Sequence, residues 1–500
     1  MQFFVDIILF LIYSGIVILL FVWIFRFWLM YVNQKFLNGF SKDSIMLEIK
    51  LPREISKSPQ AMENVMQTFL QGGGIGSAYF RNWVGNLPVY FSLEIASLEG
   101  VIHFYIRMHK KFKELVTSTL YAQYPGIEVV DADDYTKLIH YHHLSKDVDL
   151  FGINFNLKKE WTPINEDTGK AYEGEKGDYK MKADFYPIKT YVDYGLDKDP
   201  KEEFKNDPIV PLLEFMGSIS KGEYVWYQIL VQDESPFDGN KFPQTFLNKK
   251  NHKHMSMAEM AKERKKQIRS SVILKGTVSE DKYGNKEKKL IKDSDGKVIG
   301  EEDVTYAKNM TVSKKEADLS SEEKDEIESI NRKLSKPSLR SVIRVVYITK
   351  KEFFKPGQVN NALSMLKPFT GDNSFGPSTF DPYMYPWENF RGQRVPWRKE
   401  EGFEAYVERE GFYPHVGERK GLDKIEDTFF WPYPMKVRKL WRMIYEGIRH
   451  PFDHPVAKDV CILNIEELAT LYHFPGQVAS VPTLPRIDSA KSVAPSNLPV

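Results

Sequence analysis

The sequence predicts an α+β protein in which an N-terminal transmembrane helix precedes ferredoxin-like (βαββαβ) units that carry a charged insertion. Three observations predict this architecture. The stretch from Ile7 to Phe25 has no charged residue, residues 44–135 follow strand and helix patterns in the order β-α-β-β-α-β, and residues 233–337 are dense in charge. A chain of 500 residues is long enough for two or three domains.

Residues 1–32 are predicted to form a membrane anchor. About 20 mostly apolar helical residues cross the hydrocarbon core, and Ile7 to Phe25 supplies that length. Asp6 precedes the span, whereas Lys35 and Lys42 follow it, so the positive-inside rule predicts a single-pass protein of the inner membrane with its N-terminus outside and a cytoplasmic body. The alternative is a cleaved signal peptide, which would need a basic start and a small-residue cleavage site.

Residues 44–135 are predicted to form the first ferredoxin-like domain. Each element has a local signal, such as the Ser58-Pro59 start of a helix, the glycines that end it and the Glu99-Gly100 hairpin turn. The predicted strands are Ser44–Leu51, Val89–Leu98, Val101–Met108 and Ile127–Val130, and the predicted helices are Ser58–Gln71 and Phe112–Gln123.

Residues 136–368 are predicted to form a second α+β domain, interrupted by the insertion at about 233–337. Its predicted strands are Tyr179–Tyr191, Tyr224–Val231 and Leu339–Thr349, and its predicted helices are Ile209–Ile219 and Gln358–Leu366. Within the insertion we expect a basic helix that begins at Ser256, hairpins near Gly284 and Gly296, and an acidic helix that begins after Ser320.

The remaining chain divides by composition. Residues 369–481 are rich in aromatic residues and proline, with helices predicted at Lys436–Arg449 and Ile465–Tyr472, and residues 482–500 read as an extended tail. Basic and acidic residues number 69 and 68, so no net field attracts the whole chain to nucleic acid. Cys461 is the only cysteine, which excludes an intramolecular disulfide and a multi-cysteine zinc site.

Motifs for chemistry are sparse. No G-x-x-x-x-G-K-[ST] phosphate loop occurs, and the glycines after position 71 follow a predicted helix instead of preceding one. His140 and His142 would share one face of a strand and could begin a zinc site, but the sequence fixes no third ligand nearby and an ordinary surface strand is the simpler interpretation. We therefore predict no enzyme activity, no cofactor and no metal.

Two basic helices are the candidate phosphate-binding elements, for nucleic acid or anionic lipid headgroups. For the second helix, a surface helix packed by its apolar side is the favoured alternative. The basic residues are Lys262, Arg264, Lys265, Lys266 and Arg269 in the first helix and Lys436, Arg438, Lys439 and Arg442 in the second.

Three segments carry a family resemblance: MLEIKLPREISKSPQAMENVMQ after the anchor, PVYFSLEIASLEGVIHFYIRMHKKFKELVTSTLYAQYPGIEV, and LNIEELATLYHFPG near the C-terminus. The chain resembles a family of uncharacterised membrane proteins of candidate-phylum bacteria. That family is similar to the part preceding the motor in type IV secretion and HerA/FtsK-like DNA-pumping ATPases, and Leu463 to Gly476 is similar to the segment that leads into the motor. The resemblance implies a non-enzymatic, membrane-anchored docking subunit of a conjugation-like DNA-transfer system.

The predicted anchor implies the membrane as a partner, and the resemblance implies a separate P-loop ATPase. Self-association through sheet edges or the helix Ser58–Gln71 is a further expectation. Membrane-anchored binding of nucleic acid or anionic lipid through the basic helices is the alternative function. It would make binding fall steeply with salt, because each phosphate contact releases counterions.

Overall fold

A computed structural model describes most of the chain, in two compact units that are treated separately. The described residues are 2–53, 55, 57–70, 89–145, 147–162, 173–174, 177–178, 181–197, 206–233, 257–269, 272–278, 288–292, 298–303, 306–312, 319–380, 394–412, 460–476 and 483–487. Unit 1 comprises residues 1–158, 187–248 and 336–500, and unit 2 comprises residues 159–186 and 249–335.

Unit 1 begins with a βαββαβ repeat. Its elements are β1 (Ser44–Pro52), α2 (Gln60–Gln67), β2 (Tyr90–Leu98), β3 (Val101–His109), α3 (Lys113–Gln123) and β4 (Glu128–Ala132). The strands lie in the order β4-β1-β3-β2, each antiparallel to its neighbours, which is the ferredoxin-like arrangement. Glu99 and Gly100 join β2 to β3 with φ of 55° and 92°, as a two-residue hairpin turn requires.

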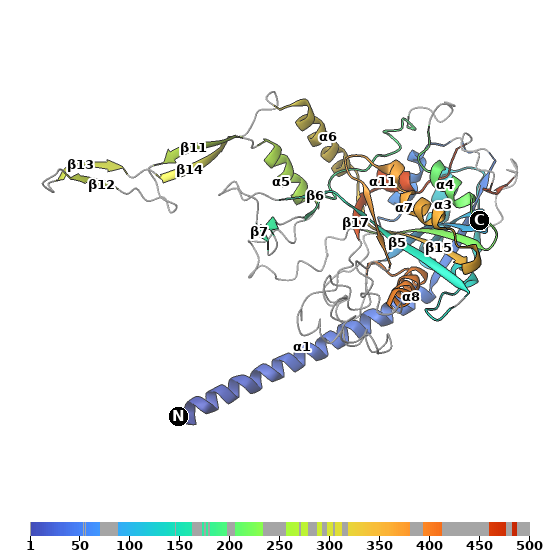
Figure 1. Cartoon of the computed structure of the whole chain (residues 1–500), viewed down its shortest axis with the longest axis horizontal. Coiled ribbons are helices and arrows are strands. Elements are labelled where there is room, and N and C mark those ends of the chain that lie inside the picture. The colour runs from blue at the N-terminus through green and yellow to red at the C-terminus, as the bar shows by residue number, and fades with distance from the viewer. Residues whose placement is uncertain are drawn as a thin grey trace. The chain divides into compact units, whose positions relative to one another are not determined.

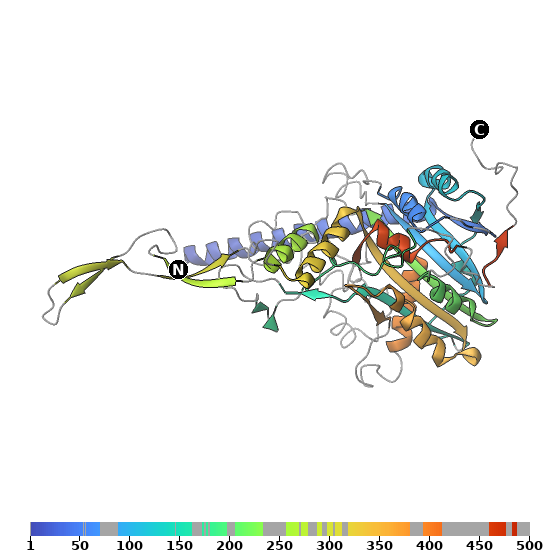
Figure 2. The same cartoon turned by 90° about the horizontal axis from the view of Figure 1, so that it is seen from above.

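A second repeat of the same kind follows. Its elements are β5 (Val148–Leu157), α4 (Val210–Gly217), β10 (Glu223–Asp233), β15 (Ser338–Lys350), α7 (Pro356–Ser364) and β16 (Phe375–Thr379). The strand order β16-β5-β15-β10 repeats that of the first four strands, and β10 pairs antiparallel with β2. The two repeats therefore share one continuous antiparallel sheet, whose strands run side by side in Figure 2.

The predicted first strand of this repeat, Tyr179–Tyr191, is wrong. Of its described residues only Met181–Lys182 (β9) are extended, pairing with Glu160–Trp161 (β6), and turns follow. The strand is β5 instead, whose alternating side chains are buried at Ile153, Phe155 and Leu157. β5 is the first strand of the repeat because it pairs with β15 on one side and with β16 on the other. These pairings join residues far apart in the chain, so the local sequence pattern does not indicate them.

The sheet of unit 1 is covered on both faces. One face packs against the helices of the two repeats, which Figure 1 shows together with α11 (Ile465–Leu471). The opposite face carries an aromatic cluster around Trp226, and α8 (Arg394–Val407) contributes Phe403 and Tyr406 to it. Strand residues alternate between these faces, so Val225 and Tyr227 join the first core and Trp226 the second.

The N-terminal helix α1 (Gln2–Lys42) ends in contact with the sheet of unit 1. Phe40 packs on Tyr90, with ring centroids 4.9 Å apart, and the Ser44 hydroxyl donates to the Phe40 carbonyl at 2.7 Å. Among the described residues, no helix combines the length and the apolar character that crossing a membrane requires. The predicted anchor from Ile7 to Phe25, the single-pass topology and the inner-membrane location are therefore corrected, because a span needs about 20 consecutive, mostly apolar helical residues.

Unit 2 contains most of the charged insertion. Its helices α5 (Met257–Arg269) and α6 (Ser321–Ser335) contact each other. Its antiparallel strand pairs are β11 (Val272–Val278) with β14 (Tyr306–Val312), β12 (Lys288–Lys292) with β13 (Val298–Asp303), and β7 (Glu173–Gly174) with β8 (Gly177–Asp178). The predicted capping box of α6 is confirmed, since the Ser320 hydroxyl accepts from the Glu323 amide at 3.2 Å and the Glu323 carboxylate accepts from the Ser320 amide at 3.0 Å. β12 and β13 flank the predicted turn near Gly296, and β11 pairs with β14. The predicted turn residues near Gly284 and Gly296 themselves lie outside the described residues.

Candidate functional site

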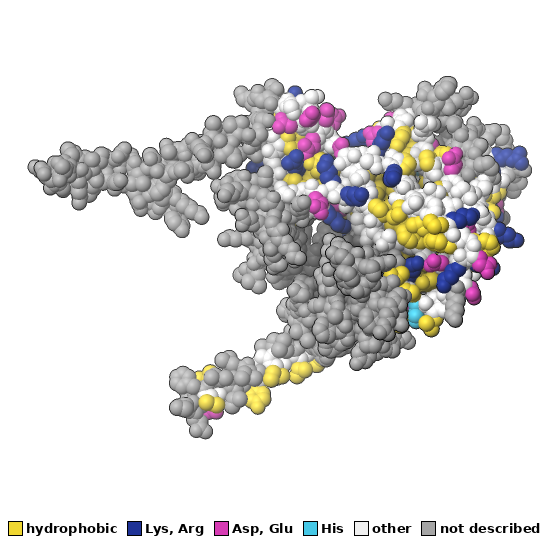
Figure 3. Space-filling model, viewed as in Figure 1, with side chains coloured by type: hydrophobic (Ala, Val, Ile, Leu, Met, Phe, Trp, Pro, Cys, Tyr) yellow, Lys and Arg dark blue, Asp and Glu magenta, His cyan; other side chains and the backbone are white. Residues whose placement is uncertain are grey.

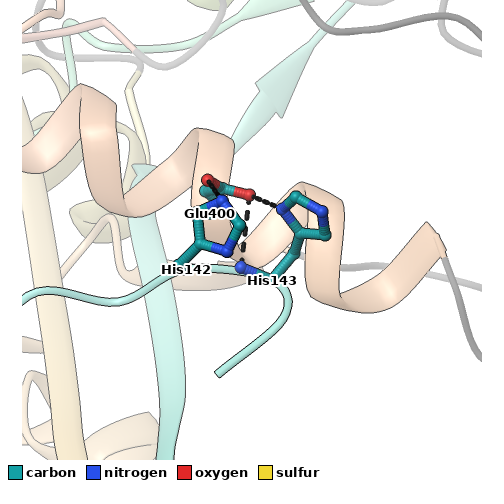
Figure 4. A group of neighbouring side chains, drawn as sticks. All are labelled: His142, His143 and Glu400. Atoms are coloured by element: carbon teal, nitrogen blue, oxygen red, sulfur yellow. Dashed lines mark hydrogen bonds and ion pairs between the residues drawn. The ribbon is translucent and has the colours of Figure 1, made fainter. Parts of the chain in front are cut away.

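Two adjacent histidines and one glutamate form the cluster of unit 1 that is best suited to chemistry. His142 and His143 lie in the loop between the 3-10 helix η3 (Tyr135–Leu138) and β5, and Glu400 lies on α8 (Figure 4). Each residue presents one ligand atom, and these atoms all lie within 4.8 Å of one another. The loop and the helix are far apart in the sequence, so the cluster exists only in the folded chain.

The two imidazoles approach different oxygens of a single carboxylate. His143 Nδ1 is hydrogen-bonded to Glu400 Oε2, and the His143 amide donates to the same oxygen at 3.3 Å. His142 Nε2 lies 3.5 Å from Glu400 Oε1. The side chains of His142, His143 and Glu400 are 54%, 14% and 9% exposed, so the cluster is closed on the Glu400 side and open to solvent at His142.

Neighbouring residues of α8 fix this geometry. Trp397 lies one turn before Glu400 on the same side of the helix, and its ring stacks on His143 with centroids 4.0 Å apart. Lys399, next to Glu400 in the sequence, does not pair with it, because the Lys399 Nζ donates to Asp149 Oδ1 at 3.0 Å. The nearest lysine in the sequence therefore pairs with a carboxylate other than Glu400.

A buried ion-pair network anchors the end of α8. Arg409, whose side chain is 1% exposed, donates from Nε and Nη2 to the Glu94 carboxylate at 3.0 and 3.1 Å and from Nη1 and Nη2 to the Asp134 carboxylate at 2.5 and 2.9 Å. The φ of Arg409 is +55°, a conformation that L-residues rarely adopt. Tyr135 and Tyr406 hydroxyls meet beside this network at 2.8 Å.

The protonation of the network follows from its contacts. Burial would raise the pKa of Asp134, but hydrogen bonding and charge from Arg409, with two hydrogen bonds from Thr136, lower that pKa to about 2. Burial would likewise raise the pKa of Glu94, and the Arg409 charge outweighs it, so the Glu94 pKa is lowered. Both carboxylates are ionised at neutral pH, and Arg409 joins β2 and the segment after β4 to the end of α8.

The sequence prediction named one member of the cluster and missed two. His140 is exposed and lies outside the cluster, and residues 140–143 form no strand. Adjacent residues of a strand would point to opposite faces, whereas this loop brings His142 and His143 together. Glu400 lies in a segment whose aromatic and glycine content predicted a loop; Pro396 in the first turn, followed by Phe403 and Tyr406 at helical spacing, was the available signal for α8.

The predicted phosphate-binding residues separate into three groups. In α5, Arg264 pairs with Glu326 at 2.9 Å and Lys265 donates to Asn331 at 2.9 Å. Of the basic residues of that helix, Lys262, Lys266 and Arg269 are exposed, at i, i+4 and i+7. Lys436, Arg438, Lys439 and Arg442 lie outside the described residues. On the face in Figure 3, basic and acidic side chains are interspersed.

Comparison of the chain with protein-family models, curated proteins and solved structures found no match. The resemblance to pre-motor segments therefore stays a prediction.

Proposed function

We propose that this chain is a non-enzymatic docking subunit of a type IV secretion-like or conjugation-like DNA-transfer system, which positions a separate P-loop ATPase. The proposal builds on the resemblance of Leu463 to Gly476 to the segment that leads into such motors. The observation that carries it is the environment of this segment, which is built into the core shared by the two repeats.

The segment is held at its start by strand pairing and a helix cap. β17 (Cys461–Asn464) pairs antiparallel with β15 of the second repeat. The Asn464 side chain then accepts from the Glu467 amide at 2.8 Å, while the Glu467 carboxylate accepts from the Asn464 amide at 2.8 Å. This capping box satisfies two backbone donors at the start of α11, and every residue of α11 is buried.

The acidic side chains of α11 connect it to other parts of unit 1. Lys336, which precedes β15, lies 2.9 Å from Glu466 and 2.7 Å from Glu63 of α2. The Thr190 hydroxyl donates to Glu466 at 2.6 Å, and the Ile188 amide donates to Glu467 at 2.9 Å. One short helix thus links the first repeat, the second repeat and the segment before α4.

The chain beyond α11 is also fixed to the sheet. The Tyr472 hydroxyl donates to the Tyr105 carbonyl of β3 at 3.1 Å, and His473 Nε2 lies 3.1 Å from Asp207. β18 (Arg486–Ile487) then pairs in parallel with the end of β1. A partner that docks near this segment would be held in a fixed orientation relative to the sheet, which is the requirement for positioning a motor.

The test is co-purification of the full-length chain with P-loop ATPases encoded in the same genome. We expect stable recovery of a HerA/FtsK-like ATPase and no ATP hydrolysis by the purified chain alone. Arg486→Ala removes hydrogen bonds to the Pro52 and Pro475 carbonyls and is expected to weaken the complex about tenfold, whereas Glu128→Gln, at an exposed position of β4, leaves it unchanged. Failure to recover any such ATPase, or unaided ATP hydrolysis, would refute the proposal.

A second candidate function is phosphate binding by α5, favoured by the exposed row of Lys262, Lys266 and Arg269. Replacing all three by Glu is expected to abolish salt-sensitive binding to DNA or anionic vesicles and to remove about two to three units from the slope of log affinity against log salt. Asp325→Lys, at an exposed position of α6, serves as a charge-change control. Unchanged binding by the triple variant would exclude α5 as the site.

A further inference from the structure

We propose that His142, His143 and Glu400 form a binding site for one divalent transition-metal ion, with Zn²⁺ as the best fit. Two imidazole nitrogens and one carboxylate oxygen are a common three-ligand set for zinc with an open fourth position. The same donors suit Fe²⁺, Co²⁺ and Ni²⁺, whereas Ca²⁺ and Mg²⁺ prefer sites made of oxygen alone. This inference departs from the sequence prediction of no metal site.

The distances suit a small ion. With metal–ligand bonds of about 2.1 Å, neighbouring ligand atoms of a tetrahedral site lie about 3.4 Å apart. His142 Nε2 and Glu400 Oε1 are 3.5 Å apart, and all three ligand atoms fall within 4.8 Å. The ion would take the place of the hydrogen bond between His143 Nδ1 and Glu400 Oε2, a change that a rotation of one side chain provides.

The surroundings hold the ligands in position for binding. Trp397 fixes the plane of the His143 ring by stacking, and the His143 backbone amide orients the Glu400 carboxylate. Lys399 is paired with Asp149. The exposure of His142 gives the ion a route from solvent and leaves its fourth position to water or to a ligand from outside the chain.

Metal binding at this place would tie the loop before β5 to α8. Glu400 lies on α8 and the buried Arg409 follows its end, so α8 would be fixed at two points, by the metal near its middle and by the Glu94–Arg409–Asp134 network after its end. An ion that binds only the folded chain stabilises it by a free energy that grows with the logarithm of the free metal concentration above the dissociation constant.

The experiment is equilibrium dialysis of chelator-treated full-length chain against Zn²⁺, followed by elemental analysis. We expect one ion per chain. His142→Ala is the most informative variant, because it leaves the His143–Glu400 hydrogen bond intact and is expected to weaken zinc binding at least about 100-fold. Glu400→Gln keeps the side-chain shape and should have the same effect. His140→Ala, exposed and two residues away, should bind as the unaltered chain does.

A spectroscopic readout separates a metal site from a hydrogen-bonded clasp. Co²⁺ in place of Zn²⁺ is expected to give visible absorption typical of nitrogen and oxygen ligands, and His142→Ala should abolish it while the circular dichroism spectrum stays unchanged. A stoichiometry below about 0.2 ions per chain, which is within the error of the dialysis, would overturn the proposal. Equal zinc binding by His142→Ala and His140→Ala would do the same and leave only a hydrogen-bonded contact between the loop and α8.

Discussion

Replacing Arg409 by Met tests whether the buried ion pairs hold α8 on the sheet. The Arg409 side chain is 1% exposed and that of Glu94 is fully buried. Met is close in length to Arg and fills much of the same volume, so the change removes the charge and the hydrogen bonds with little loss of packing. Glu94 would keep the Ser92 hydroxyl and Gln228 amide as partners, which cannot neutralise it.

The expected cost is about 3–5 kcal/mol of unfolding free energy, since removal of one partner leaves a buried charge uncompensated. Asp134 contributes less to this cost, because its side chain is 22% exposed and stays partly hydrated. Adding Glu94→Gln to Arg409→Met removes the orphaned charge, so the double variant should be at least about 1 kcal/mol more stable than Arg409→Met alone.

Urea unfolding monitored by tryptophan fluorescence measures these differences, because the ring of Trp226 lies in the adjoining aromatic cluster, with its centroid 5.8 Å from that of Tyr406. Lys110→Met is the matched control: it breaks an ion pair with Asp43 whose side chains are 63% and 49% exposed, and should cost less than about 1 kcal/mol. A loss below about 1 kcal/mol for Arg409→Met, or a double variant less stable than the single one, would refute the reasoning.

Three further predictions concern single positions. The pKa of Asp134 is lowered to about 2 in the folded chain. Its contribution to stability is therefore complete above the unfolded pKa of about 4 and is lost as the pH falls from 4 towards 2. Asp134→Asn should flatten the dependence of the urea midpoint on pH across that window. Gly100→Ala should cost about 1–3 kcal/mol in urea unfolding, because φ is +92° and a Cβ atom would lie 2.9 Å from the Ile219 carbonyl oxygen, whereas Gly222→Ala, at φ +83° and 3.4 Å from a phenylalanine ring, should cost less; equal losses would contradict the backbone clash. Asn464→Ala should lower the melting temperature by removing the cap of α11, at a cost of about 1–2 kcal/mol, and Asn464→Ser should restore part of it; no difference between Ala and Ser would argue against the cap.

The sequence correctly predicted the local elements that have clear turn or capping residues at their ends. The Glu99-Gly100 turn, the capping box at Ser320 and the helix at Ile465 each depend on residues a few positions apart, and all three occur. The candidate site depends on pairs such as His143 and Glu400, which no local pattern relates. The same is true of Arg409, which looks like a surface cation in the sequence and is buried only because Glu94 and Asp134 face it.

The sequence by itself determined the strand and helix order of the first repeat, because alternation of period two, helical periodicity and turn residues act within one element. It also determined that a charged insertion interrupts the second repeat between β10 and β15. Tertiary structure alone decided that β2 pairs with β10 to merge the repeats, that β5 begins the second repeat, and that α8 covers the opposite face of the sheet. These outcomes depend on contacts between residues far apart in the chain, whose free energy comes from burial and pairing that exist only after the elements have met.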